Sequence, residues 1–98
     1  MLKHVVLFKF KAEVPDSDLE AWVVELQQLA SQIDLIRLWE VGHELTGRTG
    51  PNAEVCLISG FDGVADLEAY DKHPAHVQVV AAARRMCSSI VRTNFWAS

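Results

Sequence analysis

The chain has 98 residues, half of them hydrophobic, and carries a net charge of −4 with an isoelectric point near 5.4. This length is typical of one domain, so residues 1–98 are expected to form a single unit. The acidic balance argues against a nucleic-acid partner, which usually requires a basic surface. The sequence lacks a secretion-signal pattern and an apolar run of about 18 residues, so we expect a cytoplasmic protein without membrane contact.

Residues 2–10 are rich in β-forming residues and are predicted to form a strand. Both faces of this strand have an apolar centre, which indicates helices over one face and a partner chain over the other. One face holds Leu2, His4, Val6, Phe8 and Phe10, and the other holds Lys3, Val5, Leu7 and Lys9.

A helix is predicted from Pro15 to about Gln32, because proline and acidic residues suit a first helical turn. Its apolar residues recur at helical spacing: Leu19, Trp22, Val23, Leu26, Leu29 and Ile33. Strands are predicted at residues 35–44 and 53–61, joined by a loop at 46–52 that lacks the phosphate-binding signature of nucleotide sites.

The second half of the chain is predicted to hold a broken helix and a last strand at residues 89–96. Asp62 is a candidate N-cap for a short helix. His73 should end that helix, because a residue before proline disfavours helical geometry, and Pro74 should begin the next. Val64, Leu67 and Tyr70 should share one apolar face of the first segment, and His76, Val79, Val80, Ala83 and Cys87 one face of the second.

The order β-α-β-β-α-β predicts an α+β, ferredoxin-like fold with a four-stranded antiparallel sheet. Its helices cover one sheet face and leave the other open. A second copy packing sheet to sheet would cover that face, so we expect a homodimer through it. Cys56 and Cys87 lack metal-ligand spacing and are expected to be reduced; a disulfide between them is the alternative.

Residues 70–76, Tyr-Asp-Lys-His-Pro-Ala-His, gather one phenol and two imidazoles and are the main candidate for acid/base chemistry. Helical phase directs Tyr70 and His76 inward and leaves His73 to shape the turn. By strand alternation, Arg92 faces the same side as Ile90, where it either binds an anionic substrate or bends outward.

Three segments resemble the stress-responsive dimeric α/β-barrel (Dabb) family along essentially the whole chain. They are Lys3-His4-Val-Val-Leu-Phe-Lys-Phe, Gly42 at the end of the second strand, and Ala69-Tyr70-x-x-His73-Pro74-x-His76. The resemblance implies a dimeric α/β barrel. The family includes plant stress proteins, bacterial proteins of unassigned role and a plant polyketide cyclase.

The acid/base pair of that cyclase falls on Tyr70 and His76, and its first-strand histidine falls on His4. The resemblance implies aldol-type chemistry without metal or cofactor, in which His76 removes a proton next to a carbonyl and Tyr70 supports the oxyanion. His4, Arg92, Val6 and Phe8 would then contact the substrate. This chain differs from the cyclase at Leu26, at Val55, and at Asn94, which replaces a last-strand carboxylate able to orient the histidine.

Each of these residues also has a structural interpretation. His76 is also explained as a core histidine that braces the helix break, and Tyr70 as a core residue whose hydroxyl finds a partner. A metal site formed by His4, His73 and His76 has no carboxylate or cysteine at suitable spacing. The sequence therefore leaves three functions open: a cofactor-independent enzyme or small-ligand protein acting on a carbonyl-rich or aromatic molecule, a non-enzymatic oligomer, and a cofactor-free monooxygenase.

Overall fold

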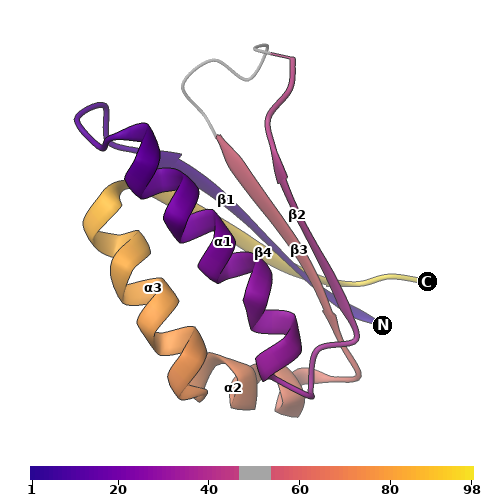
Figure 1. Ribbon diagram of the computed structural model, residues 1–98. Helices are drawn as coiled ribbons and strands as arrows, with labels where there is room; N and C mark the ends of the chain where they lie inside the picture. The colour runs from indigo at the N-terminus through magenta and orange to yellow at the C-terminus, as the bar shows by residue number, and fades with distance from the viewer. Residues whose placement is uncertain (47–53) are drawn as a thin grey trace.

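The computed structural model describes residues 1–46 and 54–98, which form one antiparallel sheet with helices on one of its faces (Figure 1). The sheet order is β2-β3-β1-β4. The strands are β1 (Leu2–Phe10), β2 (Leu38–His43), β3 (Val55–Phe61) and β4 (Cys87–Trp96), and the helices are α1 (Asp16–Gln32), α2 (Val64–Lys72) and α3 (Pro74–Met86). This arrangement confirms the predicted ferredoxin-like fold. No helix among the described residues is long and apolar enough to cross a membrane.

Strand β1 lies inside the sheet, between β3 and β4, and its two faces have different environments. The predicted alternation is confirmed, since every second residue from Leu2 to Phe10 is buried under the helices. The register pairs His4 with Ser59 and Asn94, and it pairs Val6 with Arg92. Residues of β4 opposite these buried positions therefore face the helices as well.

Helices α1 and α3 run side by side over the sheet (Figure 1). The Trp22 indole Nε1 donates a hydrogen bond of 3.0 Å to the backbone oxygen of Val79, which joins the two helices. The same indole packs edge-on against Phe8 and Phe10, with ring centroids 4.8 and 5.4 Å away. Trp22 thus links α1, α3 and β1.

The predicted break between α2 and α3 is confirmed at His73 and Pro74. His73 has extended backbone geometry (φ −63°, ψ 132°), and its Nδ1 accepts a hydrogen bond of 3.2 Å from the Ala75 backbone N–H. This contact satisfies one of the free N–H groups in the first turn of α3. Pro74, the first residue of α3, needs no such partner.

Three expectations about local structure were wrong. Asp62 does not cap α2; Gly63 occupies the N-cap position, and the Asp62 carboxylate pairs with Arg37 at 3.1 Å. The second strand begins at Leu38, because the preceding residues turn between Ile33 and Ile36. Val64 is 52% exposed, so it does not share the buried face of Leu67 and Tyr70.

Smaller differences concern element ends. The last strand begins at Cys87, two residues before the predicted start, and the third begins at Val55. The loop predicted at residues 46–52 lies outside the described residues except for Thr46.

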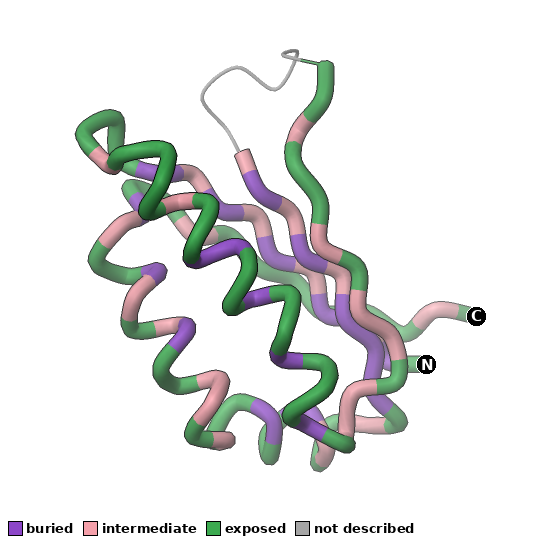
Figure 2. The backbone as a smooth tube through the Cα atoms, in the orientation of Figure 1, coloured by how far each residue is buried: buried purple, intermediate pink, exposed green. Residues whose placement is uncertain are grey.

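The sheet face away from the helices carries apolar side chains that remain accessible. Figure 2 shows β4 largely exposed along its length, in contrast to the alternating burial of β1 and β3. Val91 and Phe95 are 54% and 50% exposed. By strand register, the apolar residues of this open face include Val5, Leu7, Leu38, Cys56, Ile58, Val91 and Phe95.

Candidate functional site

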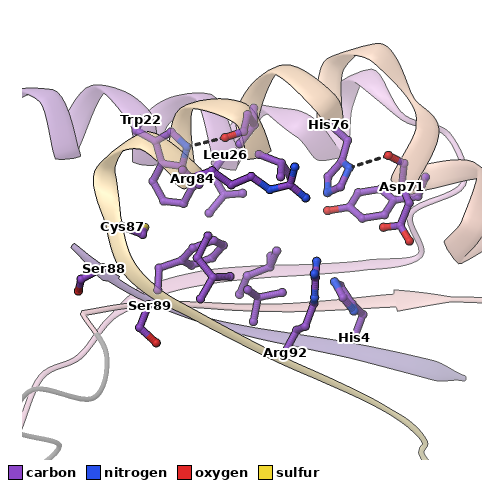
Figure 3. Close-up of a pocket in the computed structure, with 18 residues that line it drawn as sticks. His4, Trp22, Leu26, Asp71, His76, Arg84, Cys87, Ser88, Ser89 and Arg92 are labelled. Carbon is purple, nitrogen blue, oxygen red and sulfur yellow. Dashed lines mark hydrogen bonds between the residues drawn. The ribbon is translucent and has the colours of Figure 1, made fainter. Parts of the chain in front are cut away.

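A cavity of about 330 Å³ lies between the helices and the sheet (Figure 3). This volume is at the lower end of the range for small-molecule sites, about 300–1,000 Å³. Strands β1, β3 and β4 form its floor, and α1, α3 and the end of α2 form its walls. Its lining includes all six residues that the sequence nominated: His4, Val6, Phe8, Tyr70, His76 and Arg92.

The position of His76 fixes which of its ring nitrogens can accept a proton. Its Nδ1 lies 3.1 Å from the backbone oxygen of Asp71 at the end of α2 (Figure 3). A carbonyl oxygen can only accept a hydrogen bond, so Nδ1 carries the proton and Nε2 keeps its lone pair. The contact also braces the break between the helices, as the structural interpretation expected.

Burial lowers the pKa of His76 below its usual value of 6.5. The hydrogen bond to the Asp71 carbonyl and the charge of the Asp71 carboxylate oppose this effect, whereas the electrostatic interactions with His4 and Arg92 add to it. The imidazole is therefore neutral at pH 7, which is the form that a general base requires.

Tyr70 is almost fully buried, with 1% of its surface exposed. Its ring lies 4.1 Å from the His76 ring and 5.0 Å from the Phe61 ring, measured between centroids. Within the described part of the chain, its hydroxyl has no hydrogen-bond partner and is not sealed from the cavity. Burial, and to a lesser extent the negative charge of Asp71, raise the pKa of Tyr70 above its usual value of 10.0. The phenol stays protonated at neutral pH and is free to donate.

His4 reaches the cavity from β1, with its ring 6.3 Å from that of Tyr70. Its Nδ1 lies 2.5 Å from the Asn94 side-chain oxygen on β4. Asn94, which the sequence analysis considered as a group that could orient the catalytic histidine, contacts His4. The backbone of Asp71 orients His76 instead, and no side-chain identity in the sequence could have revealed that contact.

Arg92 lines the cavity from β4, so its predicted orientation is confirmed. Arg84 of α3 also lines it and was missed by the sequence analysis. The signal was present, because His76, Val80 and Arg84 follow one another at steps of four and therefore share a helix face.

The other residues considered in the sequence analysis, namely a possible metal site, His73 and the two cysteines, are not placed to act in catalysis. The described residues contain no group of three or more His, Cys, Asp or Glu side chains arranged to hold a metal ion. His73 is outside the cavity lining and caps α3. Both cysteines are free thiols; burial raises the pKa of Cys87, which lines the cavity, to about 11, so this thiol is a poor nucleophile at neutral pH.

The sequence matches the Stress responsive A/B Barrel Domain (Dabb) over residues 2–97. The chain belongs to this family. It is 30% identical to a stress-response A/B barrel domain-containing protein of Arabidopsis thaliana over 98 residues, which cover 95% of this chain and 83% of that protein.

Solved structures show the same fold. A dimeric ferredoxin-like protein from Bacteroides fragilis is 28% identical, with a TM-score of 0.79 and coverage of 96% of this chain and 93% of that one. A dimeric ferredoxin-like protein from Thermobifida fusca is 24% identical, with a TM-score of 0.88 and coverage of 98% and 90%. A hydroxynitrile lyase from Passiflora edulis is 17% identical, with a TM-score of 0.88 and coverage of 99% and 93%.

Proposed function

We propose that this Dabb domain protein is a cofactor-independent enzyme that binds a small carbonyl compound and removes a proton from the carbon next to the carbonyl group. The observation that carries this proposal is the pairing of a neutral imidazole with a protonated phenol at one end of a cavity. The Asp71 carbonyl leaves His76 Nε2 as the acceptor, and the Tyr70 hydroxyl has no partner among the described residues.

The proposed step is a proton transfer. His76 Nε2 takes the proton as the C–H bond breaks, and the electron pair of that bond moves through the carbon to the carbonyl oxygen. The resulting enolate oxygen accepts a hydrogen bond from the Tyr70 hydroxyl, which stabilises the developing charge. The enolate then either regains a proton from the His76 imidazolium or attacks a second carbonyl group.

The other cavity residues hold the substrate. Val6 and Phe8 provide an apolar surface on the floor formed by β1. His4, held by Asn94, and Arg92 provide the polar contacts that orient the carbonyl compound. Mostly apolar lining with a few convergent polar groups is typical of small-molecule sites.

Deuterium exchange tests the proton transfer without knowledge of the natural substrate. Phenylacetone is incubated with the protein in D2O, and the loss of its CH2 signal is followed by proton NMR. We expect exchange above the buffer rate, and a loss of roughly a hundredfold or more in His76→Ala, since general base catalysis contributes about 10²–10⁴-fold.

The matched control is His43→Ala, because His43 is an exposed histidine of β2 that does not line the cavity. Equal exchange by wild type and His76→Ala would exclude His76 as the base. Exchange at the buffer rate with phenylacetone and with cyclic and aliphatic ketones would leave the structural interpretation of this pair standing.

We also propose that two copies associate through the open sheet face. The dimeric relatives from Bacteroides fragilis and Thermobifida fusca support this assembly. The accessible apolar residues of this face, among them Val91 and Phe95, support it independently, because a monomer would leave them in water.

A further inference from the structure

Two arginines enter the cavity from opposite walls. In Figure 3 the Arg84 side chain extends from α3 toward His76, and the Arg92 side chain rises from β4 beside His4. A second depression next to the cavity is lined by both arginines together with Asp71 and His76. Both arginines therefore line the cavity and the adjoining depression, close to His76.

In the part of the chain that the structure describes, neither guanidinium is paired with an acidic group. Across residues 1–46 and 54–98, neither Arg84 nor Arg92 forms an ion pair or a hydrogen bond through its side chain. Asp71 is the one acidic residue of the cavity lining, against two arginines. This local positive charge is unusual in a chain whose net charge is −4.

Two cations that face one cavity repel each other, and an anion placed between them removes this repulsion. The planar guanidinium fork matches a carboxylate, with which it forms paired, charge-assisted hydrogen bonds. The cavity beyond the arginines offers Val6, Phe8 and Leu57 to an apolar remainder. A ligand with one carboxylate and one apolar group fits this distribution of charge.

We propose that Arg84 and Arg92 bind the carboxylate of the substrate, which is therefore a keto acid with an apolar group. This inference rests on the proposed proton transfer for the keto group, but the carboxylate site itself requires only the two arginines. With the carboxylate held between the two arginines, the adjoining carbonyl would reach Tyr70 and His76, which line the same cavity. Arg84 and Arg92 thus determine specificity, while His76 and Tyr70 perform the chemistry.

The carboxylate site is tested by comparing the binding of a carboxylate and of the neutral amide that has the same shape. Hydrocinnamate and hydrocinnamamide have the same shape and differ in the charged group, and their affinities are compared by NMR titration of the intact protein at low and high salt. We expect the carboxylate to bind roughly tenfold or more tightly at low salt, since hydrogen bonds to charged groups are about twice as strong as neutral ones. High salt should reduce the difference.

The variants Arg84→Gln and Arg92→Gln should each lose most of this preference. The control is Arg85→Gln, which removes the same charge from the same helix at a position outside the cavity lining. Equal affinity for acid and amide, an unchanged preference in the double variant, or no binding of hydrocinnamate at millimolar concentration would each overturn the carboxylate site.

The binding assay involves no turnover, so the two proposals fail separately. Deuterium exchange of phenylacetone without a carboxylate preference would overturn the arginine site alone. A carboxylate preference without exchange of either phenylacetone or the keto acid phenylpyruvate would retain the arginine site and exclude the proton transfer.

Discussion

Replacing Tyr70 with phenylalanine separates the catalytic interpretation of this residue from the structural one. The change removes a single oxygen atom and leaves the ring packed against Phe61, Trp39 and His76. A typical hydrogen bond contributes about 1 kcal/mol to stability. The Tyr70 hydroxyl forms none within the described residues, so we expect the free energy of unfolding to change by no more than about 0.5 kcal/mol.

The same change should have a large effect on the proton transfer. Loss of one donor to a developing oxyanion costs about 10²–10³ in rate. Chemical denaturation measures the first effect, and the phenylacetone exchange rate measures the second. Tyr70→Ala is the positive control for the stability assay, because truncating a buried aromatic residue costs about 3–5 kcal/mol.

The opposite pattern would refute this role of Tyr70. If Tyr70→Phe destabilised the protein by about 1.5 kcal/mol or more and left the exchange rate of the folded protein unchanged, the hydroxyl would be a structural group.

Four further predictions concern pH, assembly and packing. The rate of phenylacetone exchange should rise as the pH passes the lowered pKa of His76, which is below 6.5, and should then stay constant up to pH 8. A rate that rises only above pH 7 would contradict a His76 imidazole that is neutral at pH 7. On acidification, His76 becomes protonated in the unfolded chain at a higher pH than in the folded protein, because folding lowers its pKa. The contribution of His76 to the free energy of unfolding should therefore be complete above about pH 6.5 and fall below that pH. Denaturation of His76→Ala should not show this fall. Leu7→Asp should convert a dimer to monomers in sedimentation experiments, whereas Gln28→Asp on the exposed face of α1 should not; a dimer that survives Leu7→Asp would exclude the open face. Trp22→Phe should cost about 1–2 kcal/mol in denaturation experiments through loss of the bond to Val79, and a change within experimental error would show that this bond does not couple α1 to α3.

The spacing of hydrophobic residues in the sequence made most of the fold predictable. Alternation along residues 2–10 identified the buried face of β1, and the constraint of Pro74 on its predecessor located the break between α2 and α3. One error arose because a residue distant in the sequence decided the outcome. Asp62 has the residue type and position of an N-cap, but its carboxylate accepts a hydrogen bond from Arg37, which is 25 residues earlier in the chain.

The sequence predicted which residues line the cavity, but it did not predict which hydrogen bonds they form. Helical phase and strand parity identified His76, Tyr70, His4 and Arg92, because side-chain direction follows from backbone periodicity. The acceptor for His76 Nδ1 is a backbone oxygen, whose direction depends on how α2 ends. Arg84 was overlooked because a charged residue late in a helix is usually a solvated one.

The proton-transfer proposal is tested most directly by a crystal structure of the protein with phenylacetone bound. We expect the carbonyl oxygen within about 3 Å of the Tyr70 hydroxyl, and the adjoining CH2 carbon within about 3.5 Å of His76 Nε2. A ketone bound outside this cavity, or one inside it whose carbonyl turns away from both residues, would contradict the proposal.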